Sequence, residues 1–317
     1  MVGSALVRRL RQGGFTNIVM RSHSELELLD QRLVFDFLKM EKPDYVFVAA
    51  GKVGGIHANN NYGAEFIYQN LVIEANVIHG AYQAGVKQLC FLGSSCIYPR
   101  ECPQPIKEEY LLTGPLEPTN EPYAIAKIAG IKLCESYNRQ YCTRYLSVMP
   151  TNLYGVNDHY DLDNSHVLPA LIRKTHEAKL RGDRELVLWG SGKPRREFLH
   201  VDDLAAACVF LMELQCMDTA GESSQGLDAP KIDVFLQPPI INIGCGTDIS
   251  ILELANMVMD IIGFTGEIVF DASKPDGTPR KLLDVSLLKR LGWDATIPLR
   301  DGIAGTYAEL LRSHRLS

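Results

Sequence analysis

Short, continuous apolar runs alternate in the first half of the chain with longer segments of helical periodicity. The runs at residues 44–51, 87–93 and 145–149 are too short for helices and predict strands buried on both faces. A run at residues 16–20 predicts another short strand. The segments between them carry apolar residues every three or four positions and predict helices. The helical segments are residues 30–40, 62–84 and the stretch that follows residue 121.

The second half of the chain is less regular. Short strands are predicted at residues 185–190 and 267–270. Ser250 and Glu253 form the sequence pattern of a capping box, which predicts the start of a helix. Residues 215–239 show no sustained periodicity and predict a surface excursion. Predicted helices in this half lie at residues 204–214 and 302–313.

Alternating strands and helices predict an α/β fold with a doubly wound parallel sheet. A chain of 317 residues with 46% hydrophobic content is long enough for one large domain and a smaller lobe. We expect residues 1–165 to form the larger domain and residues 166–317 to form mainly a smaller C-terminal α/β lobe, with some segments that return to the first domain.

Charge and cysteine usage narrow the class of protein. A net charge of −6 disfavours nucleic acid and anionic membranes as partners, because both select basic surfaces. The sequence has no apolar run long enough to span a bilayer and no signal-peptide pattern, so we expect a cytoplasmic protein. The eight cysteines include no Cys-x-x-Cys pair, which predicts neither a disulfide framework nor a metal site.

Tyr123 and Lys127 are the first candidates for chemistry. Residues four apart lie on one face of a helix, so the Lys127 ammonium is expected to reach beneath the Tyr123 phenol and to lower its pKa toward the working range. Ser94 follows the strand at residues 87–93, at the sheet edge where ligands bind in open α/β folds. A core tyrosine with a solvated lysine is the alternative interpretation of the pair.

A strand that ends in Ser94 and Ser95, followed by Tyr98 and then by Tyr123 and Lys127, resembles the extended short-chain dehydrogenase/reductase family. The resemblance covers nearly the whole chain. It implies a Rossmann-like domain with NADP as cofactor, a nucleotide-sugar substrate for the C-terminal lobe, and a homodimer formed by the two long helices.

Three further motifs resemble a branch of this family that epimerises two carbons flanking a ketone and then reduces that ketone. They lie at residues 93–99, 117–123 and 274–281. The resemblance to this branch implies that Ser94, Tyr123 and Lys127 act in the reduction. It makes Cys96 and His166 the epimerisation pair, with Cys96 as the base. The alternatives are an inert buried cysteine and a structural histidine.

The start of the chain departs from the family pattern. Residues 1–10 predict a helix with no strand before it, and Gly3 matches the last glycine of the dinucleotide fingerprint. Two explanations are open. Either the start of this sequence is set too far downstream, or the protein has lost cofactor binding. Because every motif downstream is intact, we favour the first explanation. Arg21, with His23 nearby, favours the 2′-phosphate of NADP, and a surface arginine is an equally supported alternative.

The resemblance also implies two sets of binding residues. The cofactor set is Met1, Val2, Gly3, Arg21, His23, Gly93, Ser94, Ser95, Lys127, Pro150, Thr151, Asn152, Leu153 and His166. The substrate set is Lys174, Trp189, Arg196 and Asp276. Structural roles are the alternative for each member of the substrate set. Two other functions stay open: another sugar-nucleotide epimerase or dehydratase, which would need neither Cys96 nor His166, and a non-catalytic truncated relative.

Overall fold

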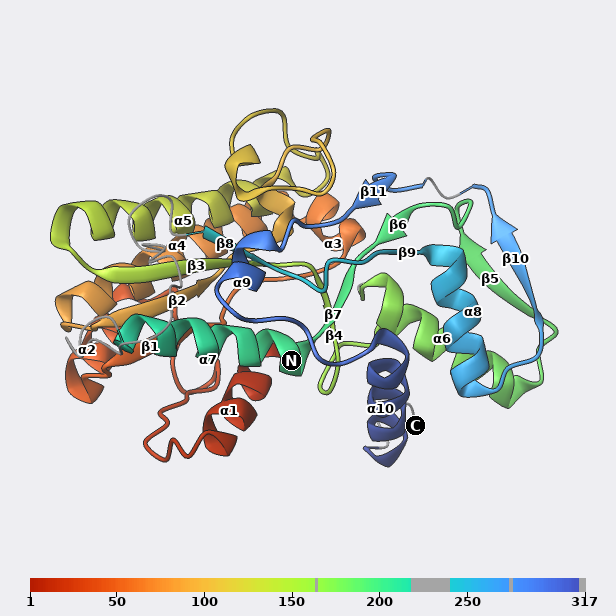
Figure 1. The fold of residues 1–317 in the computed structure, drawn as a ribbon, viewed down its shortest axis with the longest axis horizontal. Coiled ribbons are helices and arrows are strands. Elements are labelled where there is room, and N and C mark those ends of the chain that lie inside the picture. The colour runs from red at the N-terminus through yellow and green to blue at the C-terminus, as the bar shows by residue number, and fades with distance from the viewer. Residues whose placement is uncertain (163–164, 218–239, 274–275, 314–317) are drawn as a thin grey trace.

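A computed structural model describes residues 1–162, 165–217, 240–273 and 276–313 (Figure 1). Its main sheet has four strands in the order β1-β2-β3-β8, and every neighbouring pair is parallel. The strands are β1 (Tyr45–Val48), β2 (Gln88–Leu92), β3 (Arg144–Pro150) and β8 (Ile240–Ile243). The predicted parallel α/β sheet is therefore confirmed. Residues 240–243 return to it from the C-terminal half of the chain.

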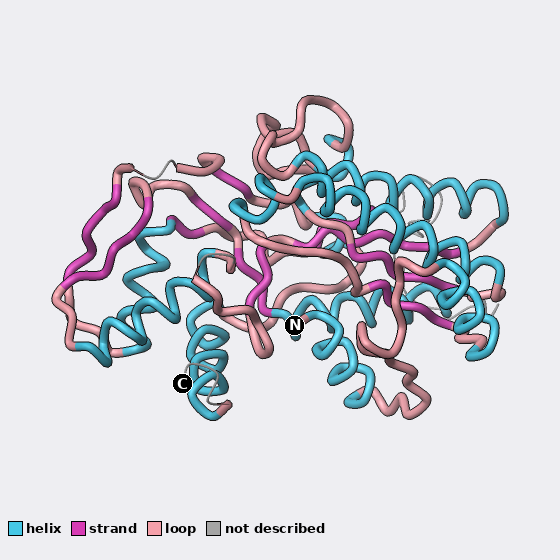
Figure 2. Tube along the Cα trace, turned by 180° about the vertical axis from the view of Figure 1, so that it is seen from behind, coloured by secondary structure: helices cyan, strands magenta, loops and turns pink. Residues whose placement is uncertain are grey.

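Helices cover both faces of this sheet (Figures 1 and 2). One face carries α2 (Gln31–Glu41), α4 (Gly63–Gln83) and α5 (Glu121–Tyr141), and the other carries α1 (Val2–Gln12) and α7 (Val201–Met217). A short helix, α3 (Ile56–Asn61), precedes α4.

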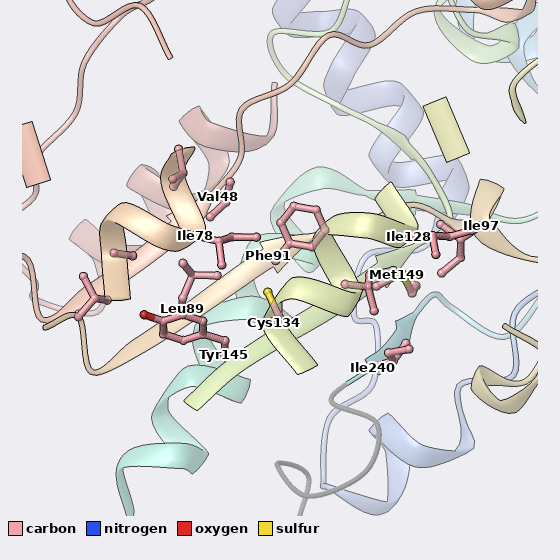
Figure 3. Close-up of a cluster of buried hydrophobic side chains, with 14 of the residues drawn as sticks. Val48, Ile78, Leu89, Phe91, Ile97, Ile128, Cys134, Tyr145, Met149 and Ile240 are labelled. Atoms are coloured by element: carbon pink, nitrogen blue, oxygen red, sulfur yellow. The ribbon is translucent and has the colours of Figure 1, made fainter. Parts of the chain in front are cut away.

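Successive side chains of a strand point to opposite faces, and β2 follows this rule. Leu89 and Phe91 pack with Ile78 of α4 in one core cluster (Figure 3). Cys90 and Leu92 pack on the other face, in the cluster that includes α1 and α7. Burial on both faces explains why this strand is apolar at nearly every position.

Local signals fix the start of α2 and both ends of α5. The Asp30 side chain accepts a hydrogen bond of 3.1 Å from the Leu33 amide and caps α2. Pro122 lies in the first turn of α5, where its missing N–H is tolerated. Cys142 ends α5 in a left-handed conformation, with φ of 54°. These ends place Tyr123 within the first turn of α5, close to the carboxyl ends of the strands.

The smaller lobe has its own core. Helices α6 (Val167–Arg181), α8 (Ile251–Ile262) and α10 (Leu299–Arg312) pack around it, and the parallel pair β5 (Glu185–Trp189) and β10 (Glu267–Asp271) lies at its outer side (Figure 1). The predicted capping box is confirmed, because Ser250 and Glu253 bond reciprocally at the start of α8.

Short strands join the two parts. A three-stranded sheet consists of β11 (Arg280–Lys281), β6 (Arg195–Arg196) and β9 (Ile249–Ser250), and a parallel pair consists of β4 (Asn152–Tyr154) and β7 (Phe198–His200). The remaining helical segments are η1 (Ser95–Ile97), η2 (Glu108–Tyr110) and α9 (Ser286–Arg290). None of these strands was predicted, since two or three residues carry no detectable periodicity.

The predicted strand at residues 16–20 is wrong. These residues have no regular structure, and Val19 and Met20 are exposed. A strand needs a neighbour for its backbone groups, and none of the described strands pairs with this segment. Most of the predicted excursion at residues 215–239 lies outside the described residues. None of the described helices combines the length and apolarity needed to cross a bilayer.

Glu197 lies between the main sheet and the smaller lobe. Its fully buried carboxylate accepts hydrogen bonds from the Gly246 amide at 2.7 Å and the Leu283 amide at 3.1 Å. Its backbone carbonyl accepts from the side chains of Thr151 and Asn152, at 3.2 and 2.8 Å. Glu197 thus forms hydrogen bonds with three separate segments, which follow β3, β8 and β11.

We expect Glu197→Ala to lower the free energy of unfolding by about 2–4 kcal/mol, because two buried amides lose their acceptor. Urea denaturation measures this loss. Glu185→Ala is the matched control, since Glu185 is exposed on β5. An equally small loss in both variants would contradict the role given to Glu197.

Candidate active site

Helix α5 positions the two residues of the Tyr-x-x-x-Lys pattern. Tyr123 and Lys127 lie one turn apart, and the Lys127 Nζ atom is 5.8 Å from the centre of the Tyr123 ring. The Tyr123 ring makes an edge contact with Phe66 of α4, with 6.3 Å between the ring centres. The predicted shared face is therefore confirmed.

The electrostatic part of that prediction is wrong for the protein without ligands. Burial raises the pKa of the Tyr123 phenol, nearby Cys96 and Glu74 raise it further, and a hydrogen bond with Ser94 lowers it. The Lys127 ammonium instead pairs with the Glu74 carboxylate of α4, at 3.1 Å. Tyr123 is half-buried as a residue, but protein surrounds its hydroxyl, so the loss of hydration is the largest effect.

Ser94 and Cys96 follow the carboxyl end of β2. The Ser94 hydroxyl accepts a hydrogen bond from the Cys96 amide at 3.2 Å and so caps the short helix η1. The Cys96 Sγ atom lies 3.4 Å from the Asn120 Nδ2 atom and 3.8 Å from the Lys281 Nζ atom. The thiol is half-buried, and two donors from distant segments face it.

His166 lies at the N-terminus of α6. Its side chain is exposed, yet enough protein surrounds the ring that loss of hydration lowers its pKa, and the positive charge of Lys281 lowers it further. Lys281 therefore acts on both members of the predicted epimerisation pair. A neutral imidazole is favoured at neutral pH in the protein alone.

Residues predicted to bind the cofactor lie where two strands of the main sheet end. Gly93, Ser94 and Ser95 follow β2, and Pro150 and Thr151 lie at the end of β3, with Asn152 and Leu153 continuing into β4. An added Cβ at Gly93 would come within 2.5 Å of the end of the Met149 side chain and 3.3 Å of the Val148 carbonyl oxygen, so the backbone here lies close to β3. The structure brings this part of the set together.

The rest of the predicted cofactor set is more scattered. Met1, Val2 and Gly3 begin α1, and an added Cβ at Gly3 would meet no atom within 4 Å. Arg21 pairs with Glu41 at 2.6 Å, and His23 is largely exposed beside Glu27. The positions of Arg21 and His23 leave the 2′-phosphate interpretation as a prediction.

The predicted substrate residues gather in the smaller lobe. The Lys174 Nζ atom lies 4.4 Å from the centre of the exposed Trp189 ring, and burial lowers the pKa of Lys174. Asp276 accepts hydrogen bonds from the Ser191 amide at 2.8 Å and the Ser191 hydroxyl at 2.6 Å. Arg196 donates to the Thr278 carbonyl at 2.6 Å. Lysine, arginine and an accessible indole are groups that bind phosphates and rings.

Strand β11 connects the substrate candidates to the catalytic candidates. Lys281 pairs in register with Arg196 of β6, and its side chain reaches Cys96. Sequence reasoning assigned no role to Lys281, Asn120 or Glu74. Lys281 and Asn120 lie within motifs that the sequence singled out, whereas Glu74 gave no signal beyond its place on an apolar helix.

A cavity in the described part of the chain lies elsewhere. It has a volume of about 540 Å³ and lies between the start of α8 and residues 295–299. Arg195 lines it but is already paired with Asp248 and Glu253. Cys245 also lines it, and its thiol bonds with backbone carbonyls. No predicted site residue lines this cavity, so the strand ends are the better candidate for the active site.

Within the described ranges, no cluster of His, Cys, Asp and Glu is placed to hold a metal ion.

Comparisons with known proteins identify the family of the chain. The model of the NAD dependent epimerase/dehydratase family matches residues 1–222. GDP-L-fucose synthase of Escherichia coli is 56% identical over 99% of this chain and 94% of that protein. GDP-L-fucose synthase 1 of Arabidopsis thaliana is 54% identical over 99% of this chain and 91% of that protein.

Among solved structures, a GDP-mannoheptose C4 reductase of Campylobacter jejuni with NADP bound is 40% identical. It covers 98% of this chain and 95% of its own, with a TM-score of 0.85. Because the family model spans more than half of the chain and the curated relatives match almost all of it, the chain belongs to the NAD dependent epimerase/dehydratase family.

Proposed function

We propose that the chain converts GDP-4-keto-6-deoxy-D-mannose to GDP-L-fucose with NADPH, through two epimerisations and one reduction. The relatives named GDP-L-fucose synthase, at 54 and 56% identity, support this assignment. The observation that carries it is the position of Cys96. A thiol with two facing donors lies directly beside Ser94 and Tyr123, so an epimerising group and a reducing pair share one site.

Epimerisation begins at a carbon next to the ketone. Cys96 removes the proton, and the charge that develops on the ketone oxygen is stabilised by hydrogen bonds from Ser94 and Tyr123. His166 delivers a proton to the opposite face. Because its lowered pKa favours the neutral imidazole, His166 first takes up a proton from water, and the imidazolium then gives that proton to the enolate carbon. The Lys281 Nζ atom lies 3.8 Å from the Cys96 Sγ atom, on the side of the thiol that faces the smaller lobe's strand β11.

Reduction uses the same oxygen. NADPH, when bound, supplies the hydride to the ketone carbon. Tyr123 gives its proton to the ketone oxygen, and Ser94 holds that oxygen by a hydrogen bond. Because burial raises the pKa of Tyr123, the phenol is fully protonated at neutral pH and is ready to act as the acid.

The residues present fit the cofactor. The carboxyl ends of the parallel strands, the glycine at position 93 and the open space beside Gly3 in the first turn of α1 suit a dinucleotide with its pyrophosphate at the helix. Residues 1–165 would hold NADP. Residues 166–317 would mainly hold the nucleotide sugar, through Lys174, Trp189, Arg196 and Asp276.

A reductase without epimerase activity is the second candidate, because the Campylobacter jejuni relative is named a C4 reductase. Such an enzyme needs Tyr123 and Lys127 but no acid–base pair for carbon. The site favours the first candidate, since Cys96 and His166 both lie within the influence of Lys281.

A homodimer would form through α4 and α5, as the family resemblance implies. The exposed apolar and aromatic side chains on or next to these helices support an interface at this place. They are Tyr62, Tyr68, Ile125 and Tyr141.

Every cysteine that the structure describes is a free thiol, which fits the reducing conditions of the cytoplasm.

Cys96→Ser should suppress solvent deuterium incorporation into the substrate by at least about 100-fold, because serine is a far weaker base. NADPH affinity should change little. Mass spectrometry of recovered substrate measures the exchange, and fluorescence titration measures NADPH binding. Cys142→Ser is the matched control, since Cys142 is exposed at the end of α5. Exchange at the unmodified rate in Cys96→Ser would remove Cys96 from the mechanism.

Arg21→Ala should weaken NADPH far more than NADH, through loss of a charge-assisted contact of about 1.5–3 kcal/mol with the 2′-phosphate. Calorimetric titration of both cofactors measures the difference. Arg32→Ala is the control, because Arg32 forms a similar exposed ion pair with Asp36. Equal losses for the two cofactors would show that Arg21 does not read the phosphate.

Tyr68→Arg combined with Ile125→Arg should yield monomers, because charges on two exposed apolar positions of α4 and α5 oppose association. Light scattering gives the mass in solution. Leu180→Arg, at an exposed position of α6, should leave the dimer intact. A dimer that survives the double substitution would place the interface elsewhere.

A further inference from the structure

Glu74 is a buried acid that the proposed reaction does not use. It lies on α4 beneath Lys127, and the side chains of both residues are buried, with 1% and 4% of their surface exposed. The Glu74 Oε1 atom is 3.1 Å from the Lys127 Nζ atom. Two ionisable groups this far from water are costly to bury, so their retention in a core needs a reason.

The surrounding residues leave space for this carboxyl group and little else. An added Cβ at Gly130 would come within 2.6 Å of the Glu74 Oε2 atom and 2.5 Å of the Phe91 ring. The ring of Phe91 also lies under the Lys127 ammonium, whose Nζ atom is 4.8 Å from the ring centre. Packing thus holds the carboxyl, the ammonium and the aromatic ring in one arrangement.

We propose that Glu74 is a positioning residue for the reduction: it holds the Lys127 ammonium near Tyr123 and supplies, through Lys127, the proton that restores Tyr123 after each turnover. This inference rests on the function proposed above. When Tyr123 has given its proton to the ketone oxygen, a buried phenolate remains. One proton then moves from a Lys127 N–H bond through a bridging water to the phenolate oxygen, and one moves from the Glu74 O–H bond to the Lys127 nitrogen. Solvent returns a proton to Glu74 before the next turnover.

The charges balance in this relay. The negative charge leaves the Tyr123 oxygen and ends on the Glu74 carboxylate, directly beside the re-formed Lys127 ammonium. The carboxyl can hold the required proton, because burial raises the pKa of Glu74 to about 7 in spite of Lys127. The titratable side chains that act on Glu74 or respond to its charge are Lys127, Tyr123 and Cys134, all from α5.

The sign of the pH effect on stability follows from the raised pKa. The folded protein prefers the protonated carboxyl, so the contribution of Glu74 to stability is complete below the unfolded pKa of 4.5 and is lost as pH rises through about 7. Glutamine mimics the protonated form and cannot titrate. The melting temperature of the unmodified protein should therefore fall, relative to that of Glu74→Gln, between about pH 5 and pH 8.

Single-turnover oxidation of NADPH by the keto sugar nucleotide tests the relay. Glu74→Gln should slow this step by at least about tenfold and flatten its pH dependence near neutrality. Deuterium exchange, which depends on Cys96, should change far less. Cys134→Ala is the matched control: it truncates a buried side chain of α5 that lies near Glu74 and should keep the pH profile. An unmodified rate and profile in Glu74→Gln would overturn the proposal.

Two measurements keep the test independent of folding and of the proposed function. If Glu74→Gln does not fold, Glu74→Asp takes its place, because aspartate keeps a titratable carboxyl but moves it away from Lys127. This variant should slow reduction and keep the pH dependence. Unmodified kinetics would overturn the relay. If the unmodified protein oxidises no NADPH with this substrate, the proposed function has failed. The pH-dependent difference in melting temperature between the unmodified protein and Glu74→Gln then still decides whether Glu74 titrates beside Lys127. If the two melting temperatures change with pH in the same way, Glu74 does not titrate in this range.

Discussion

The hydrogen bonds of Glu197 fix the geometry on which the site depends. Its backbone carbonyl binds the side chains that follow β3, and its carboxylate binds the amides that follow β8 and β11. A parallel sheet brings strand ends to one edge but does not place a second lobe above that edge. Because Leu283 is held by Glu197, the position of Lys281 relative to Cys96 is fixed by a buried bond rather than by a flexible loop.

Burial governs the electrostatics more than sequence spacing does. The i,i+4 spacing correctly places Lys127 under Tyr123, yet spacing cannot show that Glu74 already pairs with the ammonium. The phenol in the protein alone therefore stays protonated, which suits an acid in the reductive direction. The same low-polarity surroundings that raise the pKa of Tyr123 also raise that of Glu74, so two groups in one pocket both hold protons near neutral pH.

The sequence predicted the parallel sheet and the long helices because their patterns are local and repeated. The apolar run before Ser94 and the capping box at Ser250 are examples that the structure confirms. The strand predicted at residues 16–20 shows the limit, since its residues match a strand but no described strand pairs with them. Strands of two residues, such as β6 and β11, form only because distant segments meet, so no local pattern could find them. For the same reason Lys281 and Glu74 became site residues only in three dimensions.

Two chemistries at one ketone impose opposite demands on the site. Epimerisation needs a base that reaches carbon, whereas reduction needs an acid that stays on oxygen. In the proposed mechanism Ser94 and Tyr123 of the main domain serve the oxygen, whereas Cys96 is faced by Lys281 from β11, near the other end of the chain. The cation that faces Cys96 is thus carried by the strand that also pairs with Arg196. If Arg196 binds the diphosphate, substrate binding and the environment of the epimerising thiol are coupled through a single two-residue strand, and neither can shift without the other.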